Sequence, residues 1–242
     1  IADDWPHNRD HPFRPMGATE AANAYEMLLP ERLRLRPLGK VAFLWTDDES
    51  NFAGVYVDGV IPERIVILDH EGSLDTSPLY RSAISFADAL KSQRTTLTGW
   101  WRIPVDFPNS GDEAVRPAGQ AQSATDLDAV NHLLSLLDGD LTADSKRAIS
   151  YAALSLVPPD QSGMLAAWVY HRDTFIASKA CRMMGCKRNL AALNDLAQLA
   201  ETRTSVIRTD AIQGIGLLGT PDARRVLLKM VDYADHFMPV IG

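Results

Sequence analysis

The chain has 242 residues, of which 46% are hydrophobic and 23% charged, a composition typical of globular proteins with one large or two modest domains. No stretch approaches the ~18 consecutive apolar residues of a membrane-spanning helix, and the first residues, IADDWPHNRDHP, are polar, unlike a secretory signal. The formal charge of −7 disfavours a nucleic-acid partner, because phosphates would be repelled.

The negative charge is concentrated in the first half of the chain. Residues 1–122 contain 12 Lys and Arg against 18 Asp and Glu, a balance of −6, whereas residues 123–242 contain 12 against 13. An acidic surface favours a basic partner that is reached by electrostatic steering. The alternative interpretation is that these charges serve only solubility.

The first half of the chain predicts a small, mainly antiparallel α+β domain. Residues 1–17 predict an irregular arm, and residues 18–29 a short helix that Thr19 caps. Period-two alternation and apolar runs then predict four strands, LRLR, KVAFLW, FAGVYV and RIVILD. A helix is expected over residues 85–93, with Phe86, Ala89 and Leu90 on one face.

A stretch rich in Pro, Gly, Ser and Gln, residues 104–124, predicts a linker between two domains. The pair Trp100 and Trp101 just before it is expected to fold back onto the first domain. We therefore predict an α+β domain over residues 1–122, with its core in 17–103, and a helical domain over residues 123–242.

Every segment of the second half has a helical pattern. The expected helices cover residues 125–137, 142–156, 163–170, 173–184, 189–201, 205–218 and 221–233. Met183-Met184-Gly185 matches Leu217-Leu218-Gly219 at an offset of 34 residues, which predicts a repeated helix–turn–helix unit. The last unit, VIRTDAIQGIGLLGTPDARRVLLKMV, resembles a HEAT-type repeat; an irregular helical bundle is the alternative.

The two cysteines, Cys181 and Cys186, are five residues apart within one expected helix. Positions i and i+5 point to different sides of a helix, so no disulfide is expected between them. No further cysteine or histidine lies near them at the spacing of a zinc site. They are interpreted as buried apolar residues in a reducing compartment, and the cytoplasm is the expected location.

Acidic residues follow the predicted strands, with Asp47, Asp48 and Glu49 after one and Asp69, His70 and Glu71 after another. Such residues could ligate a divalent cation or act as a general acid and base. Asp69 and Glu71 share one side of an extended chain while His70 points to the other, which weakens that interpretation. A binding surface or a structural turn is favoured, and no catalytic residue, metal or cofactor is predicted.

The order of features in residues 40–90 resembles the SUKH superfamily, which groups yeast Smi/Knr-type cell-wall regulators with many bacterial immunity proteins. The resemblance rests on an acidic turn, a strand of small, apolar and aromatic residues, a strand that ends in a D/H/E turn, and a closing helix. In this chain these features are FLWTD (43–47), NFAGVYV (51–57), VILDHE (66–71), PLYR (78–81) and SFADAL (85–90).

The resemblance implies an antitoxin, not an enzyme, that neutralises a cognate bacterial toxin, often a nuclease, by occluding its active site. The charged rim of the sheet would comprise Asp47, Asp48, Glu49, Asp69, His70, Glu71 and Asp75, with Tyr56 and Tyr80 as aromatic anchors. One alternative is a scaffold that recruits partners through its helical repeats. Another is a small metal-dependent hydrolase that uses Asp47, Asp69 and Glu71.

Overall fold

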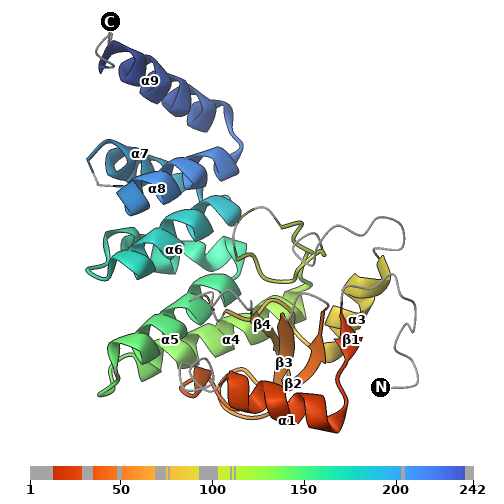
Figure 1. Ribbon diagram of the computed structural model, residues 1–242. Helices are drawn as coiled ribbons and strands as arrows, with labels where there is room; N and C mark the ends of the chain where they lie inside the picture. The colour runs from red at the N-terminus through yellow and green to blue at the C-terminus, as the bar shows by residue number, and fades with distance from the viewer. Residues whose placement is uncertain are drawn as a thin grey trace, which may run out of the picture. The chain divides into compact units, whose positions relative to one another are not determined.

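The computed structural model describes residues 13–28, 35–47, 51–68, 75, 77–92, 103–109, 111, 113–202 and 205–237 (Figure 1). The chain divides into two compact units, Ile1–Leu156 and Val157–Gly242, and each is described by itself. The predicted boundary between residues 122 and 123 differs from this division, because it falls inside the first unit. Two helices predicted for the second domain therefore belong with the sheet.

The first unit contains a sheet and several helices. Its elements, in chain order, are β1 (Arg14–Pro15), α1 (Ala18–Met27), β2 (Val41–Thr46), β3 (Phe52–Tyr56), β4 (Ile65–Leu68), α3 (Ala83–Ser92), α4 (Gln120–Leu136) and α5 (Ala143–Leu156). The chain is thus of mixed α and β structure, with a small four-stranded antiparallel sheet in the order β1-β2-β3-β4, as predicted in outline.

One predicted strand is wrong, and one observed strand was not predicted. The alternating run LRLR is not a strand where it is described, because Leu35 begins a turn in which its carbonyl accepts hydrogen bonds from the backbone N–H groups of Leu38 and Gly39. The edge strand β1 instead comes from the predicted irregular arm, where Arg14 and Pro15 pair with the end of β2. A two-residue strand is too short to show period-two alternation.

A β-bulge in β2 directs its aromatic residues to opposite faces of the sheet. The pairing with β3 shifts between Phe43 and Trp45, which leaves the intervening Leu44 42% exposed. Phe43 therefore packs against Phe52, with ring centroids 6.5 Å apart. Trp45 faces the other side and packs edge-on against Phe86 of α3, at 5.5 Å.

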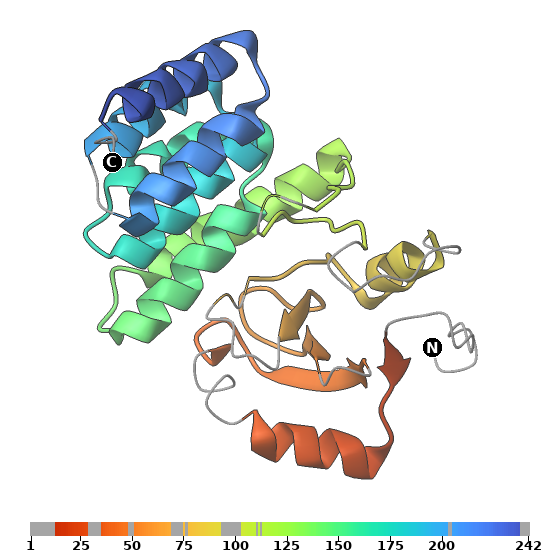
Figure 2. The ribbon, with the colours of Figure 1, turned by 45° about the horizontal axis from the view of Figure 1, so that its top comes forward.

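Both faces of the sheet are covered. Helix α3 packs on one face through Phe86, Ala89 and Leu90, as predicted, and α1 lies on the opposite side in Figures 1 and 2. All four residues of β4 are buried, which is what a strand covered on both faces requires. The sheet therefore forms the core of this unit, and neither face is open to a partner.

The predicted linker is partly folded against the sheet. Val105 and Phe107 of this stretch, and Ile103 just before it, are at most 3% exposed, and Val105 forms a parallel bridge with Val115. The backbone N–H of Phe107 donates to the carbonyl of Leu79. This segment belongs to the core of the first unit and connects it directly to α4. Trp100 and Trp101 lie outside the described residues.

The second unit is helical throughout its described residues. Its elements are η2 (Pro159–Tyr170), α6 (Thr174–Cys186), η3 (Leu190–Ala192), α7 (Leu193–Thr202), α8 (Ser205–Leu218) and α9 (Pro221–Phe237). Helix α8 packs against both α6 and α7, and α9 follows at the end of the stack (Figure 1). The helix predicted over residues 163–170 is present as a longer 3₁₀ segment, and Asp173 caps α6 by accepting from the N–H groups of Phe175 and Ile176.

Helices α6 and α8 cross at a point where glycines allow their backbones to touch. A Cβ on Gly214 would lie 2.4 Å from the carbonyl oxygen of Cys181, and one on Gly185 would lie 2.3 Å from the carbonyl oxygen of Gly214. The two cysteines are not joined by a disulfide; Cys181 is buried, as predicted, whereas Cys186 is only half-buried. Burial raises the pKa of the Cys181 thiol to about 12, so this thiol is an inert part of the core.

No described helix is both long and apolar enough to cross a bilayer.

Candidate functional site

Most of the predicted charged rim falls outside the described residues. This is true of Asp48, Glu49, Asp69, His70 and Glu71, whose role stays a prediction.

Asp47, at the end of β2, is described and has a structural role. It is 8% exposed, and its two carboxylate oxygens accept hydrogen bonds from the backbone N–H of Asn51 at 2.7 Å and from the Asn51 side-chain amide at 2.6 Å. These bonds close the turn between β2 and β3. Asp75 is half-buried, and its carboxylate accepts from the backbone N–H of Ser77. Neither residue presents its carboxylate as a free surface charge.

The two predicted aromatic anchors are core residues, which corrects their assignment to the binding surface. Tyr56 and Tyr80 are both 0% exposed. Burial raises the pKa of each phenol well above its ordinary value. Tyr80 packs against Phe86 with ring centroids 4.9 Å apart, within the cluster that joins α3 to the sheet. Large aromatic residues on strands serve a two-sided core as readily as an interface, and the sequence pattern does not separate the two uses.

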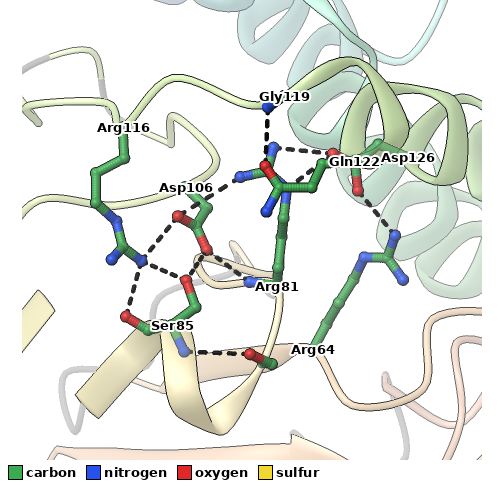
Figure 3. A network of polar contacts seen from close by, with 9 residues as sticks. Arg64, Arg81, Ser85, Asp106, Arg116, Gly119, Gln122 and Asp126 are labelled. Carbon is green, nitrogen blue, oxygen red and sulfur yellow. Dashed lines mark hydrogen bonds and ion pairs between the residues drawn. The ribbon is translucent and has the colours of Figure 1, made fainter. Parts of the chain in front are cut away.

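A buried ionic network, not foreseen from the sequence, joins the sheet, α3 and α4 (Figure 3). Asp126 of α4 has a side chain only 4% exposed. Its Oδ1 accepts from Nη2 of Arg64 at 2.9 Å, and its Oδ2 accepts from Nε and Nη2 of Arg81 at 3.1 and 2.9 Å. Charge-assisted bonds of this kind offset the desolvation of the buried carboxylate. Asp126 therefore fastens the start of α4 to the sheet.

The second carboxylate of the network, Asp106, comes from the segment predicted as a linker. It accepts from the backbone N–H of Arg81 at 2.8 Å, from the hydroxyl of Ser85, and from Nη2 of Arg116 at 2.8 Å. The Arg81 guanidinium also lies 4.5 Å from the centroid of the Phe107 ring. Arg81 thus links both carboxylates, and the network holds three arginines against two aspartates.

A groove of about 740 Å³ lies beside this network, within the first unit. One wall is the connection between β3 and β4, with Val60, Pro62 and Glu63. The other wall is one face of α4, where residues three or four apart share a side: Gln122, Thr125, Asp128, Ala129 and His132. Arg64, Arg81 and Asp126 also line the groove.

The residues of this site gave little sequence signal because they come from five separate segments. Arg64, Arg81, Asp106, Arg116 and Asp126 share no spacing or motif. One available sign is Asp106, which stands between Val105 and Phe107 in an apolar run, since a charged residue there needs a buried partner.

The arrangement is a buried ionic network beside an open groove whose lining is partly charged and partly apolar. Among the described residues, no group of three or more His, Cys, Asp and Glu is placed to hold a metal ion. No protein-family model matches this chain, and no curated protein or solved structure is significantly similar to it.

Proposed function

We propose that this chain is a non-catalytic binding protein of the immunity type, which binds a basic bacterial toxin in the cytoplasm and covers its active site. The observation that carries the proposal is the division of charge between the two compact units. Residues 1–156 contain 14 Lys and Arg against 23 Asp and Glu, a formal charge of −9. Residues 157–242 contain 10 against 8, a charge of +2.

This separation is larger than the halves of the sequence suggest, because residues 123–156 bring five carboxylates and only two cations to the sheet unit. A strongly acidic unit attracts a basic partner over distances of about a Debye length, and steering of this kind raises association rates by one to three orders of magnitude. Occlusion of a basic cleft, such as that of a nuclease, needs this complementarity and no bond-making chemistry.

In the proposed complex, turns and helices of the sheet unit would form the contact surface. Both faces of the sheet are covered, so a partner cannot dock on a bare sheet face. The resemblance to the SUKH superfamily supports the proposal through the order of β2, β3, β4 and the closing helix α3. In the second unit, the successive pairs α6–α7 and α8–α9 support a HEAT-like repeat at the 34-residue offset.

The direct test uses the full chain and the effector encoded beside its gene. We expect a 1:1 complex by calorimetry and complete loss of effector activity at one equivalent. We also expect binding that weakens between 50 and 500 mM NaCl, because screening shortens the reach of exposed charges. Absence of a complex would contradict the proposal, as would a stoichiometric divalent ion in the purified protein together with turnover of a substrate.

A scaffold that recruits partners through its helices is the second candidate, and one observation favours it. On α9, the last helix of the stack, Leu228 and Val231 are 54% and 58% exposed and lie on one side of the helix. If this side carries the contact, L228E/V231E in the full chain will abolish partner binding. The immunity proposal expects this variant to keep the complex.

A further inference from the structure

The groove beside the ionic network carries two acidic side chains that have no ion-pair partner in the part of the chain that the structure describes. Glu63 and Asp128 are both exposed and stand on opposite walls, the β3–β4 connection and α4. Neither forms an ion pair with a described residue. Carboxylates that share a groove of low-dielectric walls reinforce each other's field, which favours a cation between them.

The backbone holds Glu63 in a conformation that a glutamate does not prefer. Its φ is +67°, in the left-handed region, directly after Pro62. Two hydrogen bonds fix it there: the N–H of Glu63 donates to the carbonyl of Tyr56 at 2.7 Å, and the N–H of Tyr56 donates to the carbonyl of Arg64 at 3.0 Å. Glycine or asparagine is usual at such a position. A strained residue with its carboxylate at the groove is typical of a binding site.

The two arginines that line the groove are already neutralised by Asp126, but one N–H donor of Arg64 makes no hydrogen bond with a described residue. Arg64 and Arg81 both bind Asp126, so the five charged residues that line the groove carry a net formal charge of −1. The Arg64 side chain is 92% buried, since 8% is exposed, and its Nε has no acceptor among the described residues. Arg64 lines the groove, and a buried donor without an acceptor is costly, so a turn of the guanidinium that brings Nε to an acceptor oxygen in the groove would be favoured.

We propose that this groove binds a basic segment of the partner protein, with a Lys or Arg side chain between Glu63 and Asp128 and a backbone carbonyl oxygen on Nε of Arg64. This assignment rests on the proposed function and adds to it a location and a partner chemistry. A phosphate or other dianion does not fit, because the unpaired charges of the groove are negative. A peptide supplies the cation and the acceptor together.

The test compares two variants of the full chain that remove the same charge from the same unit. E63Q/D128N removes the two groove carboxylates, whereas D138N/D140N removes two exposed carboxylates of the α4–α5 connection, which does not line the groove. The probe is a fluorescent peptide of four Gly-Arg repeats, followed by anisotropy, with four Gly-Glu repeats as its control. Both variants concern exposed side chains, and equal melting temperatures will show that both fold.

We expect the Gly-Arg peptide to bind about ten-fold more weakly to E63Q/D128N, and within about two-fold of the parent affinity to D138N/D140N. The Gly-Glu peptide should not bind. Equal weakening by both variants would overturn the assignment, since it would mean diffuse charge attraction only. No binding of the Gly-Arg peptide to the parent protein would overturn it as well.

Binding measurements with the effector encoded beside the gene distinguish an error in the groove assignment from an error in the proposed function. If the effector binds and E63Q/D128N leaves its affinity unchanged, the groove assignment is wrong and the proposed function stands. If the Gly-Arg peptide occupies the groove but the effector does not bind, the immunity function is wrong and the basic-segment site stands.

Discussion

At the scale of single residues, Asp126 carries the buried ion pairs that join α4 to the sheet. Its carboxylate lies between Arg64 and Arg81 and is almost fully buried. Replacement by an uncharged isostere leaves two guanidinium groups buried beside a group that cannot neutralise them, and the loss of one partner from such a pair costs about 3–5 kcal/mol.

We therefore predict that D126N lowers the free energy of unfolding of the sheet unit by about 3–5 kcal/mol in urea titrations. The matched control is D128N, two residues along the same helix. The Asp128 carboxylate is exposed and forms no ion pair with a described residue, so this change should stay within about 0.5 kcal/mol. Equal effects of the two substitutions would show that the Asp126 ion pairs contribute nothing to stability.

The buried hydroxyl of Tyr56 leads to the opposite prediction, because its removal should stabilise the protein. Its hydroxyl is buried without a hydrogen-bond partner among the described residues, which destabilises the folded state. We predict that Y56F raises the free energy of unfolding by about 1 kcal/mol and leaves partner binding unchanged. Y170F is the control, because the Tyr170 hydroxyl donates to Asp195 at 2.9 Å and its removal should lower stability by about 1 kcal/mol. Weaker partner binding by Y56F would restore Tyr56 as a contact residue.

At the scale of elements, the crossing of α6 and α8 is set by Gly214. A Cβ there meets the carbonyl oxygen of Cys181, which is backbone and cannot rotate away, so the two helices must separate. We predict that G214A lowers the free energy of unfolding of the second unit by about 1–3 kcal/mol, which is the usual cost of overpacking.

Gly216 is the matched control in the same helix. A Cβ at this position meets nothing within 4 Å, and alanine has the higher helix propensity, so G216A should raise stability by up to about 1 kcal/mol. Differential scanning calorimetry of both variants measures the two changes in stability. A stabilised G214A would mean that the helices do not approach as closely as described.

The elements themselves were largely predictable because their periodicity is strong. Apolar runs marked β2, β3 and β4, and the helical pattern gave α8 its bounds without error. The prediction of a linker failed because tertiary contacts, not local composition, determine the structure of that segment. The segment around Asp106 has the composition of a linker, yet Ile103 and Phe107 are buried because the sheet offers them an apolar surface.

The candidate site was not predictable from local pattern. Its arginines and aspartates are brought together only when β4, α3 and α4 assemble, and no local rule relates Arg64 to Asp126, 62 residues apart. The positive φ of Glu63 could not be predicted either, since glutamate is uncommon in the left-handed region and the sequence Pro62-Glu63 contains no glycine or asparagine that would indicate it.

At the scale of the whole molecule, the chain combines an acidic unit of charge −9 with a helical unit of charge +2. We propose that the acidic unit recognises the basic partner, through two carboxylates beside a groove that form no ion pair with any described residue. Electrostatic attraction of this kind acts mainly on the association step, while contacts made after docking set the dissociation rate. Salt should therefore affect the two rate constants differently.

The most direct test of this account is the association rate constant of the full chain with the effector encoded beside its gene, measured by stopped flow at 50 and 500 mM NaCl. We predict that the association rate constant falls at least ten-fold across this range, because the Debye length shortens from more than about 10 Å to less than about 8 Å. The dissociation rate constant should change by no more than about three-fold. An association rate constant that is the same at both salt concentrations would contradict the account.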